Sequence, residues 1–272
     1  MPSGRTVGAI LTLVRWENAL LSVAGVMLGA WWATGRPNEP GTIVMAAVAV
    51  LLTAFANADN DVRDYDIDRI AHPDRPLPSG ALSLHAARLV VGVSAATALV
   101  VASLLGGPQT LAAVGVIAIM TLYNRGMKAH GVPGNVIVAI VASLPFLFGA
   151  WSVASPGAGL PLFLVGVPLH FAREIAKDLD DVAGDAAHRR TLPLRAGPGI
   201  ARLVVVSSVA LFVLALAPFA VRRPAFAIVA LPAVALCVAA ARRVLSGQRG
   251  TARLLKSAMV VAMVAFVLSA RW

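Results

Sequence analysis

Charge is scarce in this sequence, and negative charge is the scarcest. Only 13% of the 272 residues are charged and only 13 residues are acidic, whereas 58% are hydrophobic and the mean hydropathy is +0.81. A water-soluble domain has too little interior to hide so large an apolar fraction. The single cysteine, Cys237, lies in an apolar segment. It excludes a disulfide or a thiolate metal site built within this chain, and we expect it to be a small core residue.

The hydrophobic residues fall into blocks of about 14 to 20, the length that crosses a ~30 Å hydrocarbon core as a helix. They predict an all-α, polytopic membrane protein with about nine transmembrane helices and a single transmembrane domain over residues 1–272. The first block is followed by eight like it, so we expect no removable signal peptide. The predicted spans are 15–32, 42–58, 86–105, 110–124, 134–151, 160–176, 200–221, 225–241 and 254–270.

Lysine and arginine are distributed unequally between the two ends of these spans. Of the 23 basic residues, 19 fall on the side of the N-terminus, and the other four are Arg36, Arg222, Arg223 and Arg271. The positive-inside rule therefore predicts a multi-pass protein of the cell membrane with a cytoplasmic N-terminus and cytoplasmic loops after the second and sixth spans. Because the basic residues lie between spans, the net charge of +10 does not indicate a nucleic-acid partner.

The few acidic residues gather in two groups, which follow the second and the sixth predicted spans. The first group is Asp59, Asp61, Asp64, Asp66, Asp68 and Asp74, and the second is Glu174, Asp178, Asp180, Asp181 and Asp185. If the second span continues as a helix, a rotation of 100° per residue places Asp61, Asp64 and Asp68 on one face. The same face carries Asn57 and Asn60, whereas Asp59 and Asp66 point elsewhere.

The second group repeats this spacing at Asp178, Asp181 and Asp185, on one helical face with Glu174. Like charges at such positions repel each other unless a cation lies between them. Oxygen ligands suit Mg²⁺, which usually bridges one or two carboxylates to a substrate phosphate. The two carboxylate faces therefore predict a site for Mg²⁺ and a diphosphate. The alternative is that both groups are solvated loop charges paired with nearby basic residues.

Other polar residues lie at the same membrane depth. The basic residues that could neutralise a departing diphosphate are Arg75, Lys128 and Lys177, although each could instead be an orientation anchor. Arg15 and Asn18 could line the mouth of the same cavity, or could simply end the apolar run. The ring of Tyr123 could face an allylic cation, or could belong to an interfacial aromatic belt.

These motifs resemble the signatures of the UbiA superfamily of intramembrane prenyltransferases. The first signature, Asn-Asp-x-x-Asp-x-x-x-Asp, matches residues 60–68 and is followed by Arg-Pro-Leu-Pro-Ser-Gly at 75–80. The second, Asp-x-x-x-Asp, matches Asp181 and Asp185. The segments 122–135 and 173–185 look most like the ether-lipid branch, which adds a second geranylgeranyl chain to geranylgeranylglyceryl phosphate.

The resemblance implies a prenyltransferase that depends on Mg²⁺ and moves a polyprenyl group, expected to be geranylgeranyl, from its diphosphate to a lipid acceptor. It implies a central cavity that opens to the cytoplasmic side. The implied Mg²⁺–diphosphate site is Asn60, Asp64, Asp68, Asp181 and Asp185, touched by Lys128 and Arg75, with Arg15, Asn18 and Asn57 at matching places. Asp61 and Asp178 are expected to contribute by their spacing.

Three other functions fit parts of the sequence. The same chemistry could prenylate an aromatic, quinone-precursor or chlorin acceptor. An ion or lipid transporter would also carry acidic residues in its membrane helices, but transporters place them near the bilayer midplane, and here they follow the ends of spans. A non-catalytic assembly subunit would require both acidic groups to be accidental.

Overall fold

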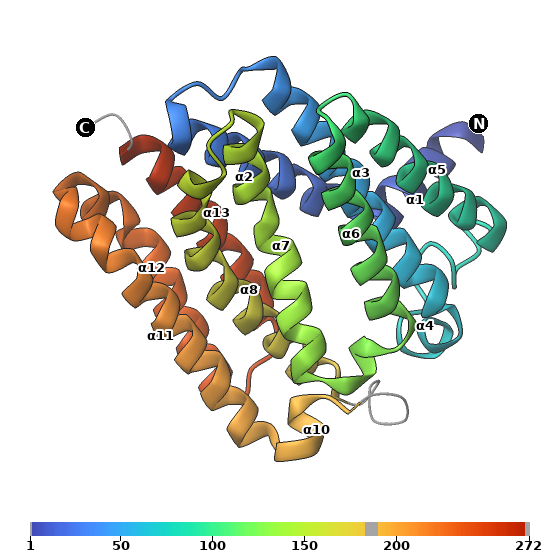
Figure 1. Cartoon of the computed structure of the whole chain (residues 1–272). Coiled ribbons are helices and arrows are strands. Elements are labelled where there is room, and N and C mark those ends of the chain that lie inside the picture. Colours follow the sequence, from blue (N-terminus) through green and yellow to red (C-terminus); the bar gives the residue numbers. More distant parts are fainter. Residues whose placement is uncertain (1, 183–189, 270–272) are drawn as a thin grey trace. The chain divides into compact units, whose positions relative to one another are not determined.

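The computed structural model describes residues 2–182 and 190–269, and every regular element in this part of the chain is a helix (Figure 1). The long helices are α2 (Trp16–Thr34), α3 (Pro40–Arg63), α5 (Leu84–Ser103), α6 (Gly107–Arg125), α7 (Val132–Ser152), α8 (Leu160–Asp180), α11 (Pro198–Arg222), α12 (Pro224–Leu245) and α13 (Thr251–Ser269). The short ones are α1 (Pro2–Val14), α4 (Tyr65–Ala71), η1 (Met127–His130), η2 (Pro156–Gly159) and α10 (Leu192–Ala196). The predicted all-α class is confirmed.

Within the described residues, seven helices are long and apolar enough to cross a membrane: α3, α5, α7, α8 with η2, α11, α12 and α13. The α1–α2 pair, bent by 52°, makes an eighth if it is one span. Helix α6 matches the predicted span 110–124 but is not among them. It has Pro108 and Gln109 at one end and Asn124 and Arg125 at the other, which leave only a short apolar middle. The predicted number of nine spans is therefore not confirmed.

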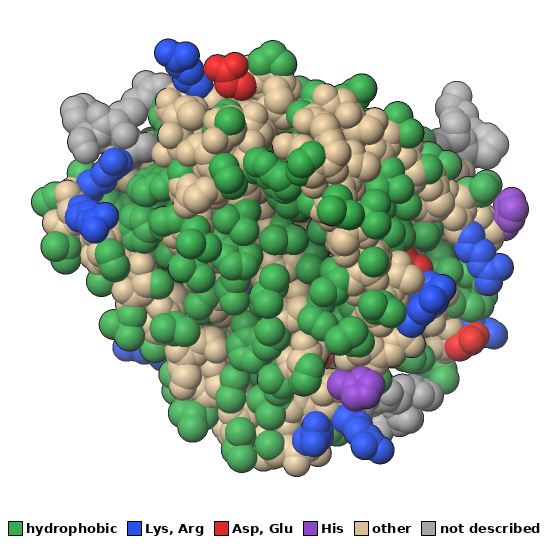
Figure 2. All heavy atoms as spheres, viewed as in Figure 1, with side chains coloured by type: hydrophobic (Ala, Val, Ile, Leu, Met, Phe, Trp, Pro, Cys, Tyr) green, Lys and Arg blue, Asp and Glu red, His purple; other side chains and the backbone are tan. Residues whose placement is uncertain are grey.

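Most of these helices expose apolar side chains. In the apolar windows of α5 and α11 only 22% of the residues are buried. Val100, Leu214 and Leu231 are among the exposed hydrophobic side chains, and hydrophobic atoms dominate the face in Figure 2. Apolar surface on this scale is stable only against lipid or another protein, so these helices are suited to a bilayer.

The helices belong to two compact units. The first comprises Met1–Val26 and Asn38–Met127, and in it α3 packs against α1, α5 and α6. The second comprises Met27–Pro37 and Lys128–Trp272, and in it α8 packs against α7, α11 and α13, while α12 packs against α11 and α13. Each acidic group thus falls within one unit.

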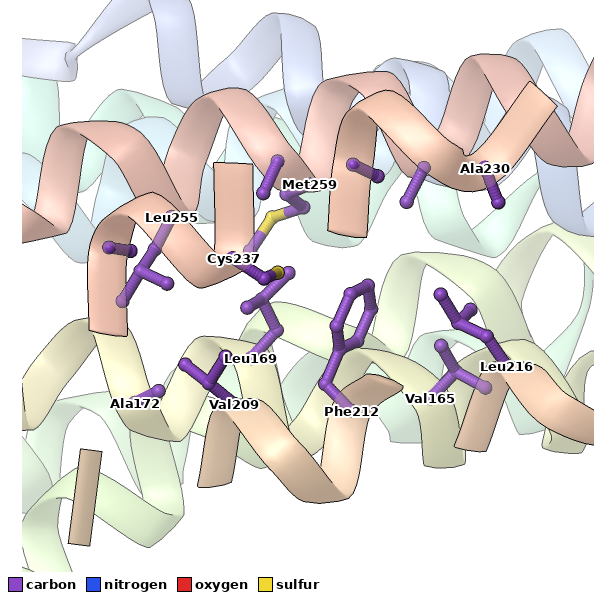
Figure 3. Packing of buried hydrophobic residues seen from close by; sticks show 14 of the residues in the cluster. Val165, Leu169, Ala172, Val209, Phe212, Leu216, Ala230, Cys237, Leu255 and Met259 are labelled. Carbon is purple, nitrogen blue, oxygen red and sulfur yellow. The ribbon is translucent and has the colours of Figure 1, made fainter. Parts of the chain in front are cut away.

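The core of the second unit follows helical periodicity. Residues of α8, α11, α12 and α13 at spacings of three, four or seven point toward one another, as amphipathic helices require (Figure 3). Those labelled in Figure 3 are Val165, Leu169, Ala172, Val209, Phe212, Leu216, Ala230, Cys237, Leu255 and Met259. Cys237 is fully buried, which confirms it as a core residue.

One close backbone contact in the second unit depends on a glycine. Gly29 of α2 is buried, and a Cβ atom at this position would overlap the carbonyl oxygen of Phe146 in α7. Small residues allow membrane helices to approach in this way. The glycine therefore sets the distance between these two helix segments.

Gly29→Ala is expected to destabilise the protein by about 1–3 kcal/mol, because the obstructing atom belongs to the backbone and cannot turn aside. The midpoint of thermal unfolding in detergent measures this. Gly92→Ala in α5 is the matched control, since its Cβ would meet nothing within 4 Å and alanine favours a helix. Equal midpoints for the two variants would contradict the close approach.

Candidate active site

The first acidic group lies where α3 gives way to α4. Helix α3 continues beyond the apolar segment and ends just before Asp64, whose backbone (φ −87°, ψ 5°) interrupts it. The Asp64 amide still donates to the Asn60 carbonyl (2.9 Å), and the Asp68 amide donates to the Asp64 carbonyl (2.7 Å). The helical phase is therefore nearly preserved across the break.

The predicted face of this segment is buried. Asp61, Asp64 and Asp68 are only 5%, 2% and 3% exposed, whereas Asp66 is exposed. Isolated carboxylates are costly to bury, so they need cationic partners, metal ions or hydrogen bonds. The interpretation of these residues as solvated loop charges is wrong for these three aspartates.

Two arginines contact the buried carboxylates. Arg15 Nη2 lies 2.8 Å from Asp61 Oδ1, and Arg75 Nη1 lies 2.6 Å from Asp68 Oδ2 and 4.0 Å from Asp61 Oδ1. Arg15 is the residue between α1 and α2, with a positive φ of 52° that only a few per cent of non-glycine residues adopt. The acidic face is thus paired with two guanidinium groups, one from a residue that precedes it in the sequence and one from a residue that follows it.

The electrostatics of this face favour a bound cation. Burial raises the pKa of the Asp68 carboxyl above its ordinary value; Arg75 opposes this, and the charges of Asp61 and Asp64 raise it further. In residues 2–182 and 190–269 no three acidic, histidine or cysteine side chains form a ready-made metal centre. The donors Asn60, Asp61, Asp64 and Asp68 nevertheless offer only amide and carboxylate oxygens, the set that Mg²⁺ prefers, so they fit this ion in donor type.

The predicted asparagines and Tyr123 all belong to the first unit, as this acidic group does. Asn60 Nδ2 lies 3.4 Å from Asp61 Oδ1. Asn57 instead donates to the Val14 carbonyl (3.1 Å) at the end of α1. Asn18 is half-buried; its backbone amide donates to the Arg15 carbonyl (2.7 Å), and its carbonyl accepts from Ser22 Oγ (3.1 Å). Tyr123 is half-buried in the last turn of α6.

The second acidic group lies at the end of α8. Asp178 Oδ2 accepts a hydrogen bond from Asn135 Nδ2 of α7 (2.7 Å), and Lys177 Nζ lies 2.6 Å from Glu174 Oε2. Asp181 is exposed and terminates the helix. Asp185 lies outside the described residues, and Lys128 is half-buried in η1. In this unit, Glu174 is therefore engaged by Lys177, while Asp178 is oriented by an amide.

The sequence did not reveal the structural roles of two buried polar residues, Asn135 and Asp59. Asn135 is buried and orients Asp178, but nothing in the local pattern marks it. Asp59 is also buried: both of its oxygens accept from Arg63 Nε (2.9 and 3.0 Å), and Oδ2 accepts from Asn124 Nδ2 of α6 (2.9 Å). The i, i+4 spacing of Asp59 and Arg63 was the available signal. Asp59 thus faces away from the acidic face, as predicted, and ties α3 to α6.

Asp59→Ala is expected to destabilise the protein by about 1–3 kcal/mol, because the buried Asn124 amide loses its acceptor and Arg63 loses its partner. Thermal unfolding in detergent measures the change. Asp66→Ala, which removes an exposed carboxylate seven residues away, should change stability by less than about 0.5 kcal/mol. A loss for Asp59→Ala no larger than that of Asp66→Ala would contradict a structural role of Asp59.

Membrane-length helices that end in buried carboxylates and arginines define a membrane protein with an ionic site at the ends of its spans. The model of the UbiA prenyltransferase family matches residues 22–268, and the chain belongs to this family. It is therefore a prenyltransferase, as the resemblance of its acidic motifs to this family implied.

Relatives of known name span nearly the whole chain. The chain is 35% identical to the digeranylgeranylglyceryl phosphate synthase of Methanopyrus kandleri over 277 residues, which cover 96% of this chain and 98% of that protein. The synthase of the same name from Halobacterium salinarum is also 35% identical, with 98% of each chain covered.

Solved structures agree with the fold. A UbiA homologue from Aeropyrum pernix K1 has a TM-score of 0.80 at 21% identity, with 93% of this chain and 98% of that chain covered. A UbiA homologue from Archaeoglobus fulgidus, bound to GPP and Mg²⁺, has a TM-score of 0.73 at 20% identity, with 96% and 98% covered.

Proposed function

We propose that this protein transfers a geranylgeranyl group from geranylgeranyl diphosphate to the free hydroxyl of geranylgeranylglyceryl phosphate and releases diphosphate. The observation that carries the proposal is the buried row of Asp61, Asp64 and Asp68, bracketed by Arg15 and Arg75 at the end of an apolar helix. The full-length relatives named digeranylgeranylglyceryl phosphate synthase support this acceptor.

The two acidic groups would act together in a single domain of residues 1–272. The residues that would hold Mg²⁺ are Asn60, Asp61, Asp64, Asp68, Asp178, Asp181 and Asp185. When bound, the ion supplies positive charge that stabilises the departing diphosphate. Arg75, Lys128 and Lys177 would add fixed positive charge on the same leaving group, while Arg15, Asn18 and Asn57 would bind substrate.

The transfer breaks the bond between the allylic carbon and the diphosphate oxygen, and the electron pair leaves with the diphosphate. The acceptor hydroxyl oxygen then bonds to the allylic carbon and gives up its proton. The ring of Tyr123, at the end of α6, would stabilise the developing allylic cation by a cation–π contact. Apolar helices exclude water, which would otherwise capture the cation as an alcohol.

The proposal includes a membrane topology. Nine described helices have 19 residues or more, and we place all nine in the membrane, α2 and α6 included. The N-terminus and both acidic groups would lie on the cytoplasmic side, where 19 of the 23 basic residues gather. The substrate cavity would be central and open toward that side.

Asp64→Asn and Asp181→Asn are each expected to lower turnover by at least about 100-fold, the scale of losing one preorganised electrostatic contact in a transition state. Purified protein is supplied with geranylgeranyl diphosphate, acceptor and Mg²⁺, and released diphosphate is measured. Asp66→Asn serves as the matched control because this aspartate is exposed and lies off the helical face of Asp61, Asp64 and Asp68. Full Mg²⁺-dependent turnover by both variants would show that the two groups do not form the site.

The identity of the acceptor is tested by supplying a panel of lipid and aromatic acceptors. We expect the wild-type protein to prenylate geranylgeranylglyceryl phosphate and to leave aromatic acceptors unchanged, because its full-length relatives carry the name of the ether-lipid synthase. Mass spectrometry of the lipid products measures the outcome. Prenylation of an aromatic acceptor alone would overturn the acceptor while leaving the reaction class intact.

A further inference from the structure

The first unit contains a cavity of about 330 Å³ that is distinct from the acidic face. It lies where the end of α3 meets the start of α5, and its lining residues are Asp59, Val62, Arg63, Arg88 and Val91. This volume is near the lower bound for pockets that hold small ligands.

The cavity carries positive charge that the protein itself uses only in part. Arg63 donates to Asp59 through Nε alone, and within the described part of the chain its two Nη atoms form no hydrogen bond or ion pair. Arg88 is exposed, and no described residue pairs with it. Because Asp59 is balanced by Arg63 and also accepts from Asn124, Arg88 leaves the cavity with a net positive charge. Guanidinium groups with free donors recognise phosphate oxygens by paired hydrogen bonds.

Helical phase separates this cavity from the proposed diphosphate site. Asp59 and Arg63 are four residues apart and share one side of α3. Asp61 lies 200° around the helix from Asp59, at 100° per residue, and it contacts Arg15 and Arg75 instead. A ligand in the cavity would therefore lie on the other side of α3 from the proposed donor.

The surroundings of the cavity are those of a membrane surface. Its apolar wall is Val62 and Val91. Helix α5 is a candidate membrane span, and its side chains Leu89 and Val93, beside Arg88 and Val91, are 55% and 61% exposed. A ligand that places a phosphate against the arginines can thus lay an apolar tail along α5.

We infer that this cavity binds the phosphate group of an anionic membrane lipid, held by Arg63 and Arg88. Such a lipid would be a bound structural ligand rather than a substrate, and it would remain in place during turnover. The inference is independent of which acceptor is prenylated.

Binding is measured by native mass spectrometry of the full chain in detergent, titrated with phosphatidylglycerol and, separately, with zwitterionic phosphatidylcholine. The wild-type protein should bind phosphatidylglycerol more tightly than phosphatidylcholine. Arg88→Gln should weaken that binding about tenfold, the equivalent of one charge-assisted hydrogen bond. Arg125→Gln, which changes an exposed arginine at the end of α6 outside the cavity, is the control and should bind as the wild type does.

A second variant tests the other arginine. Because Arg63→Gln alone would leave Asp59 buried without its partner, the double variant Asp59→Asn/Arg63→Gln removes both charges together; it too should lose phosphatidylglycerol. If it fails to fold, Arg88→Gln decides alone. Wild-type binding by Arg88→Gln would overturn the site, and displacement of the lipid by equimolar inorganic phosphate would overturn the lipid in favour of a free phosphate.

Discussion

The ion pair between Arg75 and Asp68 is the interaction on which the first unit's acidic face depends. Carboxylates buried at the end of an apolar helix lose hydration and stay charged only beside a counter-charge. Arg75 comes from the loop after α4, and that loop is anchored by the buried side chains of Leu77 and Leu82. Hydrophobic packing of the loop therefore positions Arg75, whose positive charge stabilises the buried carboxylates.

Helix α3 serves two purposes on two sides. One side presents Asp61, with Asp64 and Asp68 continuing it through the break, and contacts arginines from other segments. The other side presents Asp59, which pairs with Arg63 within α3 and accepts from Asn124 of α6, so that it ties the two helices together. A carboxylate that is satisfied by a neutral amide and an adjacent arginine is a structural tie, whereas carboxylates crowded together are suited to a cation. Charge density alone does not distinguish the two.

Much of this could be predicted from the sequence, because hydrophobic blocks and helical phase are local properties. The burial of Asp61, Asp64 and Asp68 and the exposure of Asp66 follow from a rotation of 100° per residue. The number of spans was harder to predict from the sequence, because α6 is helical but polar at both ends.

Contacts between distant segments could not be predicted. Asn135 and Asp178 are 43 residues apart, and no periodicity relates them. The break at Asp64 also could not be predicted, because no glycine or proline lies near it in the sequence. Contacts of this kind depend on how helices pack, which the local pattern does not encode.

The bend at Arg15 shows how closely architecture and charge are linked. At this residue the Asn18 amide donates to the Arg15 carbonyl (2.7 Å), which leaves the Val14 carbonyl to accept from Asn57. An unfavourable positive φ persists only where its surroundings hold it, and here Asn57 holds the backbone while Asp61 holds the Arg15 side chain. Both partners come from α3: Asp61 lies in its last turn and Asn57 in the turn before. The geometry of the bend and the charge of the acidic face are therefore set by the same helix.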